Sequence, residues 1–290
     1  MRRVTLQTWN MFGAAQDLRS FLRWRGIPDA HRLAHPEVVS QLHGTDVVCL
    51  QELFLEETAD FFHALPYPHK TRDHNKATLW PLTVAGSGLG IASRFPLVEH
   101  AIRPFRRPHV GAERFARKGV MWARLLVSDA PRVELDVVTT HLQSGYDAKA
   151  RRVRERQLAE LRALVDEVGS PDRAFVVAGD LNIDGLATAR EVGGEYAALR
   201  SSFDGFEDLG AKADHATFDP HPERNALAHR FESGGSPQRI DYVLFRPAAT
   251  GHVEPERFDL VLHLPLVHER GPMFASDHYG LQVTMRTRAA

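Results

Sequence analysis

Ala174-Phe-Val-Val-Ala-Gly-Asp-Leu-Asn182 contains an apolar run that ends directly in an acidic and an amide side chain. An apolar run of this length predicts a buried strand, and the two-residue period of a strand aims Asp180 and Asn182 in the same direction. The pair can bond the local backbone as a turn, or it can bind a phosphate or a metal ion. Both interpretations stay open for this segment alone, so the rest of the chain decides between them.

The same pattern, a short apolar strand followed by polar side chains, recurs along the chain. Further strands are expected at residues 4–10, 46–52, 89–93, 120–127, 133–141, 240–245 and 280–285. In the 46–52 strand, alternation places Val48, Leu50 and Glu52 on one face, so that a carboxylate ends an apolar stripe.

A few helices separate these strands. The clearest is expected at 147–168, because Val153, Leu158, Leu161 and Val165 trace one apolar stripe among many arginines. Further helices are expected at about 56–65, 29–42 and 187–202. The chain has neither an internal repeat nor a Gly/Ser-rich or Pro-rich linker. It therefore predicts two packed sheets flanked by helices in a single domain over residues 1–290.

Composition narrows the class of protein. The chain has 290 residues, of which 43% are hydrophobic and 25% charged, and this excludes collagen-like, coiled-coil and disordered classes. Its formal net charge of −1 gives no overall attraction to nucleic acid or anionic membranes. The single cysteine, Cys49, excludes an internal disulfide. Neither a signal peptide nor a transmembrane segment is recognisable, so we expect a cytoplasmic protein.

Chemically active side chains lie at or just after the ends of the expected strands: Asn10, Glu52, His141, Asp180, Asn182, Asp241, Asp277 and His278. Each of them alone fits a turn, a cap, an ion pair or a buried histidine. Their combination favours a functional cleft at the strand ends. The oxygen donors suit Mg²⁺, or Mn²⁺ or Ca²⁺ in its place. Two histidines beside such a metal suit phosphodiester hydrolysis, because one takes a proton from water while the other steadies the leaving oxygen.

These motifs resemble the endonuclease/exonuclease/phosphatase superfamily of metal-dependent phosphoesterases over nearly the whole chain. They are Thr8-Trp-Asn10, Gln51-Glu52, Ser87-Gly-Leu-Gly-Ile-Ala-Ser-Arg94, Thr140-His141, Gly179-Asp-Leu-Asn182, Arg239-Ile-Asp-Tyr242 and Ser276-Asp-His278. The resemblance implies an α/β fold, a four-layer αββα sandwich of two mixed β-sheets packed face to face with flanking helices. It also implies Mg²⁺-dependent phosphoester hydrolysis, with Glu52 as the principal metal ligand and Asn10 and Asp277 beside it.

The same resemblance implies roles for the other site residues. His278 would be the general base, oriented by Asp241. Asp180 and Asn182 would position the nucleophile and the phosphoryl oxygens. His141 would stabilise the transition state or the leaving group.

A finer resemblance is to the neutral and bacterial sphingomyelinase C branch of this superfamily. It rests on Thr140-His-Leu-Gln-Ser144 before the arginine-rich helix, on Phe115-Ala-Arg-Lys-Gly-Val120, and on Thr217-Phe-Asp-Pro220 followed by Asn225 and Arg239-Ile-Asp-Tyr242. The branch implies cleavage of sphingomyelin or a related phosphocholine lipid to ceramide, or diacylglycerol, and phosphocholine. Lys118, Asp219 and Asn225 become candidates for substrate binding. The alternative is an endonuclease or another phosphoesterase of the same superfamily, acting on DNA or a phosphorylated small molecule.

Three surface segments bear on the substrate. The aliphatic stretch 260–267 lies where exported members of the branch carry an aromatic hairpin. It could touch lipid as a loop tip, but its alternating leucines favour a covered strand. The arginines of the 147–168 helix are mixed with acids, which favours a solvated face. The basic stretch 103–118 fits phosphate contacts and a solvated loop equally. We expect a monomer with a phospholipid substrate and no stable nucleic-acid partner, and peripheral membrane contact stays open.

Overall fold

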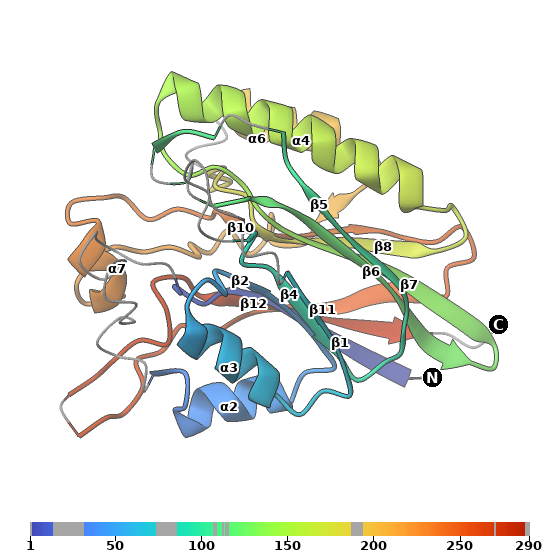
Figure 1. Cartoon of the computed structure of the whole chain (residues 1–290), viewed down its shortest axis with the longest axis horizontal. Coiled ribbons are helices and arrows are strands. Elements are labelled where there is room, and N and C mark those ends of the chain that lie inside the picture. Colours follow the sequence, from blue (N-terminus) through green and yellow to red (C-terminus); the bar gives the residue numbers. More distant parts are fainter. Residues whose placement is uncertain are drawn as a thin grey trace.

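Two six-stranded β-sheets pack face to face, and helices cover the outer face of each sheet (Figure 1). The computed structural model describes residues 2–13, 32–73, 86–106, 109–111, 113, 116–186, 194–269 and 271–287. An apolar core fills the space between the sheets, and a separate apolar cluster lies under the helices on each outer face. The expected four-layer αββα sandwich is confirmed.

The strand order explains why both sheets are mixed. The first sheet has the order β11 (Val253–Val261), β12 (Gly280–Thr287), β1 (Arg2–Asn10), β2 (Val47–Gln51), β4 (Gly90–Ser93) and β3 (His69–Arg72). The second has the order β5 (Leu97–Pro104), β6 (Gly119–Asp129), β7 (Arg132–His141), β8 (Ala174–Asp180), β10 (Asp241–Arg246) and β9 (Glu207–Asp208). The pairs β1–β2 and β7–β8 are parallel, and the other neighbouring pairs are antiparallel.

The helices bury apolar stripes against the outer faces of the sheets. α2 (Pro36–His43) and α3 (Glu56–Ala64) cover the first sheet, where Val38 and Phe62 cluster with Leu50 of β2. α4 (Ala148–Val168) and α6 (Gly194–Ser202) cover the second sheet, where Leu161 of α4 clusters with Val177 of β8. None of the helices in the described part of the chain is both long and apolar enough to cross a membrane.

α4 confirms the clearest predicted helix and corrects one inference about its arginines. Asp147 caps the helix, because its carboxylate accepts hydrogen bonds from the second and third main-chain amides after it, at 2.7 and 2.8 Å. Arg154 is only 2% exposed, pairs with Glu195, and donates to the carbonyls of Gln143 and Gly145. The predicted solvated face is therefore wrong for Arg154, which fastens the loop after β7 to the helix.

The strands that the sequence pattern does not predict, β3, β5, β9 and β11, all lie at sheet edges. These edge strands are short or only partly buried, so they lack the continuous apolar run that marks a strand buried on both faces. The short helix α7 (Ala226–Phe231) is likewise unpredicted. The helix expected at 29–42 begins at Pro36, a residue favoured in the first helical turn, while residues 29–31 lie outside the described part. The helix expected at 187–202 is described from Gly194 onward.

Only the first two residues of the stretch 260–267 lie in the covered strand that its alternating leucines predict. β11 ends at Val261, and the chain then leaves the sheet. Leu264 is 64% exposed and Val267 is 82% exposed, whereas Leu266 is buried and bridges Met273 across a short antiparallel turn. The loop-tip interpretation therefore fits this segment.

Candidate active site

Three strands of the second sheet bring ionisable side chains together at one end of the sandwich. The register pairs His141 with Asp180 across β7–β8, and Asp180 with Asp241 across β8–β10. The same strands send residues into the core between the sheets, among them Val137, Val176 and Val243. Each ionisable residue lies an even number of positions from one of these valines, so strand alternation turns it toward the first sheet.

The first sheet supplies the facing half of the site, and Asn10 at the end of β1 connects the two halves. Its amide nitrogen donates to Asp180 Oδ2 at 3.1 Å and to Glu52 Oε1 at 3.3 Å. Asp180 Oδ2 also lies 3.3 Å from His141 Nε2. A single carboxylate oxygen of the second sheet is therefore shared by an amide from the first sheet and an imidazole from its own sheet.

Glu52 enters the site through an unusual main-chain conformation. Its φ is 62°, in the left-handed region that side chains other than glycine rarely adopt. A Cβ at Gly13 would lie 2.0 Å from the Glu52 carbonyl oxygen, so only glycine fits beside this turn. Val48 and Leu50 face the outer helices, whereas Glu52 faces Asn10. The prediction that these three side chains share one face is therefore wrong, because the left-handed residue breaks the alternation.

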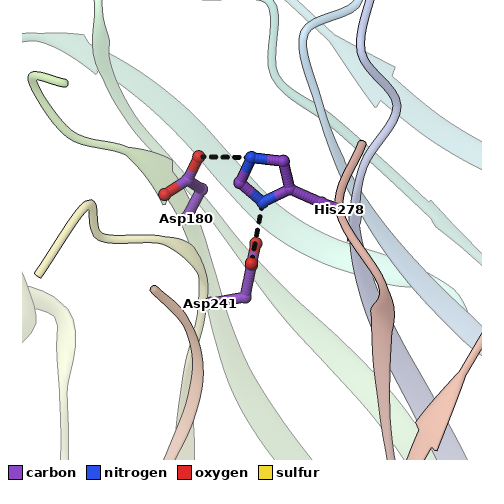
Figure 2. A group of neighbouring side chains, drawn as sticks. All are labelled: Asp180, Asp241 and His278. Atoms are coloured by element: carbon purple, nitrogen blue, oxygen red, sulfur yellow. Dashed lines mark hydrogen bonds and ion pairs between the residues drawn. The ribbon is translucent and has the colours of Figure 1, made fainter. Parts of the chain in front are cut away.

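His278 and Asp241 form a buried pair at the centre of the site (Figure 2). His278 Nδ1 lies 2.8 Å from Asp241 Oδ2, and His278 Nε2 lies 3.9 Å from Asp180 Oδ2. Trp9 Nε1 donates to the His278 carbonyl at 3.2 Å, and the Phe218 ring centre lies 5.3 Å from that of the imidazole. Because Asp241 engages Nδ1, Nε2 is the nitrogen that faces the rest of the site.

The segment Ser276–His278 is fixed from two sides. Ser276 Oγ donates to the Asn10 carbonyl at 2.7 Å and accepts the His278 main-chain N–H at 3.1 Å. Asn225 Nδ2 donates to the carbonyls of Ser276 and Asp277 at 2.9 and 3.2 Å, and Asn225 Oδ1 caps α7. The Asn225 amide is thus occupied by main-chain groups, which fits a positioning residue. Its predicted contact with substrate stays a prediction.

Burial raises the pKa values of three carboxyl groups of the site, and neighbouring carboxylates add to the shift. Burial raises the pKa of Asp180 to about 7, and the nearby charge of Asp241 adds to this effect. Burial and the charge of Glu52 likewise raise the pKa of Asp277 to about 7. Burial is also the main cause of the raised pKa of Glu52. When ionised, the carboxylates of Glu52, Asp180, Asp241 and Asp277 outnumber the cationic groups that act on them, Arg32, Lys118 and His278.

The pKa values of the two histidines are shifted in opposite directions. Burial lowers the pKa of His141 well below its usual value, and Lys118 and His278 reinforce this. Burial also opposes the charged form of His278, but Asp241 and the other nearby carboxylates outweigh it and raise the pKa of His278 well above its usual value. Environments that separate the pKa values of two neighbouring groups are typical of acid–base sites.

Hard oxygen donors suited to a divalent cation lie on the first-sheet side. Glu52 and Asp277 offer carboxylates, and Asn10 Oδ1 accepts one main-chain N–H at 3.0 Å and keeps a second lone pair. A second group with ligand atoms within 4.8 Å of one another consists of Asp180, Asp241 and His278. The 2.8 Å bond within that group already engages two of its members. The donor chemistry and the surplus of negative charge fit Mg²⁺, Mn²⁺ or Ca²⁺.

The remaining predicted residues lie around this centre or apart from it. Asn182 has a φ of 52°, and its main-chain N–H donates to Asp180 Oδ1 at 2.9 Å. Lys118 is 1% exposed, pairs with Glu113, and lowers the pKa of Asp180 through its charge. Asp219 accepts the His221 main-chain N–H at 3.3 Å in a local turn. In the basic stretch, Arg107, Arg114 and Phe115 lie outside the described residues.

Two structurally important residues are absent from the predicted site. Gln51 Nε2 donates to Thr8 Oγ1 at 3.1 Å and to Thr139 Oγ1 at 2.9 Å, which bridges the sheets directly beneath Glu52. The position of Gln51 directly before Glu52 in the Gln51-Glu52 motif could have indicated this role from the sequence. Arg32 is buried beside the Ser276–His278 segment and belongs to no recognisable motif.

The chain belongs to the endonuclease/exonuclease/phosphatase family, whose family model matches residues 8–278. A variant of beta toxin from Staphylococcus aureus with bound magnesium ions has a similar structure, with a TM-score of 0.75 and 18% identity over 97% of this chain and 99% of that chain. Sphingomyelinase C from Streptomyces griseocarneus has a TM-score of 0.71 and 23% identity, over 98% of this chain and 99% of that chain. TDP2 from D. rerio, complexed with a single-strand DNA product, has a TM-score of 0.70 and 20% identity, over 98% of this chain and 99% of that chain. No curated protein sequence matches the chain significantly.

Proposed function

We propose that this protein is a Mg²⁺-dependent phosphodiesterase of the sphingomyelinase C type. It hydrolyses sphingomyelin or a related phosphocholine lipid to ceramide, or diacylglycerol, and phosphocholine. The observation that carries the proposal is the buried His278–Asp241 pair beside the oxygen donors of Glu52 and Asp277. This arrangement offers a proton acceptor and a cation site at one place, as hydrolysis at phosphorus requires.

We assign a part of the reaction to each side chain. In the neutral form of His278, which the raised pKa of this residue confines to higher pH, Nε2 takes a proton from water while the water oxygen forms a bond to phosphorus. Asp241 stabilises the resulting imidazolium. The bond from phosphorus to the lipid oxygen breaks, and that oxygen, steadied by His141, takes up a proton from solvent, while His278 releases its proton to solvent. A divalent cation held by Glu52 and its neighbours would polarise the phosphoryl oxygens.

The exposed loop tip supports a lipid substrate. Leu264 and Val267 project from the loop between β11 and β12, and Leu266 bridges Met273, three residues before Ser276. Exposed aliphatic side chains on a loop tip can enter a membrane interface. The sphingomyelinase-like segments of the sequence, and the structural similarity to sphingomyelinase C from Streptomyces griseocarneus, point to the same class of substrate.

A phosphoesterase that acts on DNA or a phosphorylated small molecule is the second candidate, favoured by the similarity to TDP2. Of the described cations in the basic stretch, Arg106 and Arg117 are exposed, whereas two others are engaged by acids. Arg103 is paired with Glu167, and Lys118 is buried against Glu113. These charges are already balanced, whereas nucleic-acid binding depends on cations that face the phosphates.

The deciding experiment measures phosphocholine release from sphingomyelin-containing micelles, with Mg²⁺ or with EDTA, beside a plasmid and an oligonucleotide under identical conditions. Mg²⁺-dependent phosphocholine release with intact DNA supports the proposal. Nicked DNA with untouched lipid would keep the active-site assignment and replace the substrate. A protein inactive on every phosphodiester while it binds the cation would indicate a binding module that keeps the fold.

A further inference from the structure

Arg32 contacts both main-chain segments that carry the first-sheet half of the site. It is 2% exposed, although arginine is rarely buried without a specific role. Its Nη2 donates to the Phe12 carbonyl at 2.7 Å, and its Nη1 donates to the Ala275 carbonyl. Phe12 follows Asn10 by two residues, and Ala275 precedes Asp277 by two. One guanidinium therefore connects the segments that present two of the three proposed cation ligands.

The Phe12 contact controls the orientation of the Asn10 side chain. Phe12 has a φ of 53°, a strained value for a bulky residue, and its main-chain N–H donates to Asn10 Oδ1 at 3.0 Å. This bond turns the Asn10 amide nitrogen toward Glu52 and Asp180. The hydrogen bond from Arg32 to the Phe12 carbonyl holds the strained residue in place.

The Ala275 contact closes a ring of interactions around the site. Ala275 leads into Ser276, whose Oγ donates to the Asn10 carbonyl at 2.7 Å. Hydrogen bonds and main-chain links therefore connect Arg32 through Phe12 to Asn10, and back through Ser276 and Ala275. Removing the guanidinium removes one hydrogen bond from each segment at once.

We propose that Arg32 is a positioning residue that sets the spacing of Asn10 and Asp277 around Glu52, and with it the affinity for the divalent cation. This inference rests on the cation dependence of the proposed function. The planar fork of arginine presents separate N–H groups to two carbonyls, whereas the lysine ammonium is a compact point charge on a flexible stem. Lysine at position 32 would keep the charge and lose the geometry.

The test is calorimetric titration of Mn²⁺ into the EDTA-treated, dialysed protein without substrate, for wild type, Arg32→Lys and Arg32→Ala. We expect both variants to bind Mn²⁺ about 10–100-fold more weakly than wild type, with an unchanged circular dichroism spectrum. Millimolar guanidinium is expected to restore part of the affinity of Arg32→Ala. The matched control is Arg154→Lys, because Arg154 is also 2% exposed and also donates to two main-chain carbonyls. It should lose stability and keep its Mn²⁺ affinity.

The outcomes separate this inference from the proposed function. Wild-type affinity in a folded Arg32→Lys protein would overturn the role of Arg32 and leave the proposed function standing. An equal loss in Arg154→Lys would also overturn it, because the effect would then be general loosening. A wild-type protein that binds no Mn²⁺ would overturn the proposed cation dependence and the role of Arg32 with it. Should Arg32→Ala not fold, Arg32→Lys decides.

Discussion

His278 Nδ1 lies 2.8 Å from Asp241 Oδ2, and this bond joins a residue beside β12 in one sheet to the first residue of β10 in the other. We expect His278→Ala to lower kcat by about 10²–10⁴-fold, because it removes the proton acceptor. Asp241→Asn should lower kcat on the order of 10²-fold or more with a smaller effect on KM, because the amide no longer stabilises the imidazolium. Steady-state kinetics on folded variants check both. A fully active His278→Ala protein would exclude the mechanism.

The negative charge of Glu52 should matter more than its shape. Glu52→Gln is nearly isosteric, and we expect it to weaken Mg²⁺ activation by about tenfold or more, partly recovered at high Mg²⁺. Activity measured against Mg²⁺ concentration gives the shift. Glu56→Gln, at an exposed position in the first turn of α3, is the control and should activate like wild type. Equal activation curves for all three proteins would remove Glu52 from the cation site.

The raised carboxylate pKa values predict how the cation-free protein responds to pH. The pKa of Asp180 is about 7 in the folded state, above the ordinary value of 3.8. The folded state therefore holds this proton more tightly than the unfolded state, so the stabilisation is complete below about pH 4 and is lost as the pH rises to 7. Asp277, with a pKa of about 7, and His278, whose pKa is raised, act in the same direction.

Urea unfolding in EDTA at pH 5 and pH 8 measures this effect. Asp180→Asn stays neutral, so its loss of stability between the two pH values should be smaller than that of wild type by on the order of 1–3 kcal/mol. Asp172→Asn, at an exposed position, should follow wild type. The same pH dependence in all three proteins would show that Asp180 does not titrate in this range.

The loop tip between β11 and β12 predicts a separation between lipid binding and chemistry. Replacing both Leu264 and Val267 by serine should raise the apparent KM on sphingomyelin vesicles about tenfold or more, because apolar side chains no longer enter the interface. Vesicle sedimentation should show the same loss of binding. Val98→Ser, 47% exposed on β5 in the other sheet, is the control. Unchanged vesicle binding by the double variant would assign lipid contact elsewhere.

The sequence predicts the central strands well because their side chains are buried on both faces and end in recognisable polar clusters. Asp180 ends β8, as the 174–182 pattern predicts, whereas Asn182 lies two residues beyond the strand in a left-handed conformation. The edge strands escape prediction because they are short or largely exposed and so carry no continuous apolar run. The direction of Glu52 depends on one left-handed residue, which alternation does not encode. Arg32 bonds main-chain carbonyls far away in sequence, and any sequence presents such carbonyls, so no motif marks it.

The bond from Asn10 in β1 to Asp180 in β8 has a consequence for how the protein loses and regains activity. Each sheet carries only part of the proposed reacting groups, so neither sheet alone would form the active site. A partly opened molecule, with both sheets intact but slipped apart, would keep its β-sheet circular dichroism and have no turnover. During refolding, catalysis should therefore be the last signal to return, and its rate would report the moment at which the two sheets close on each other.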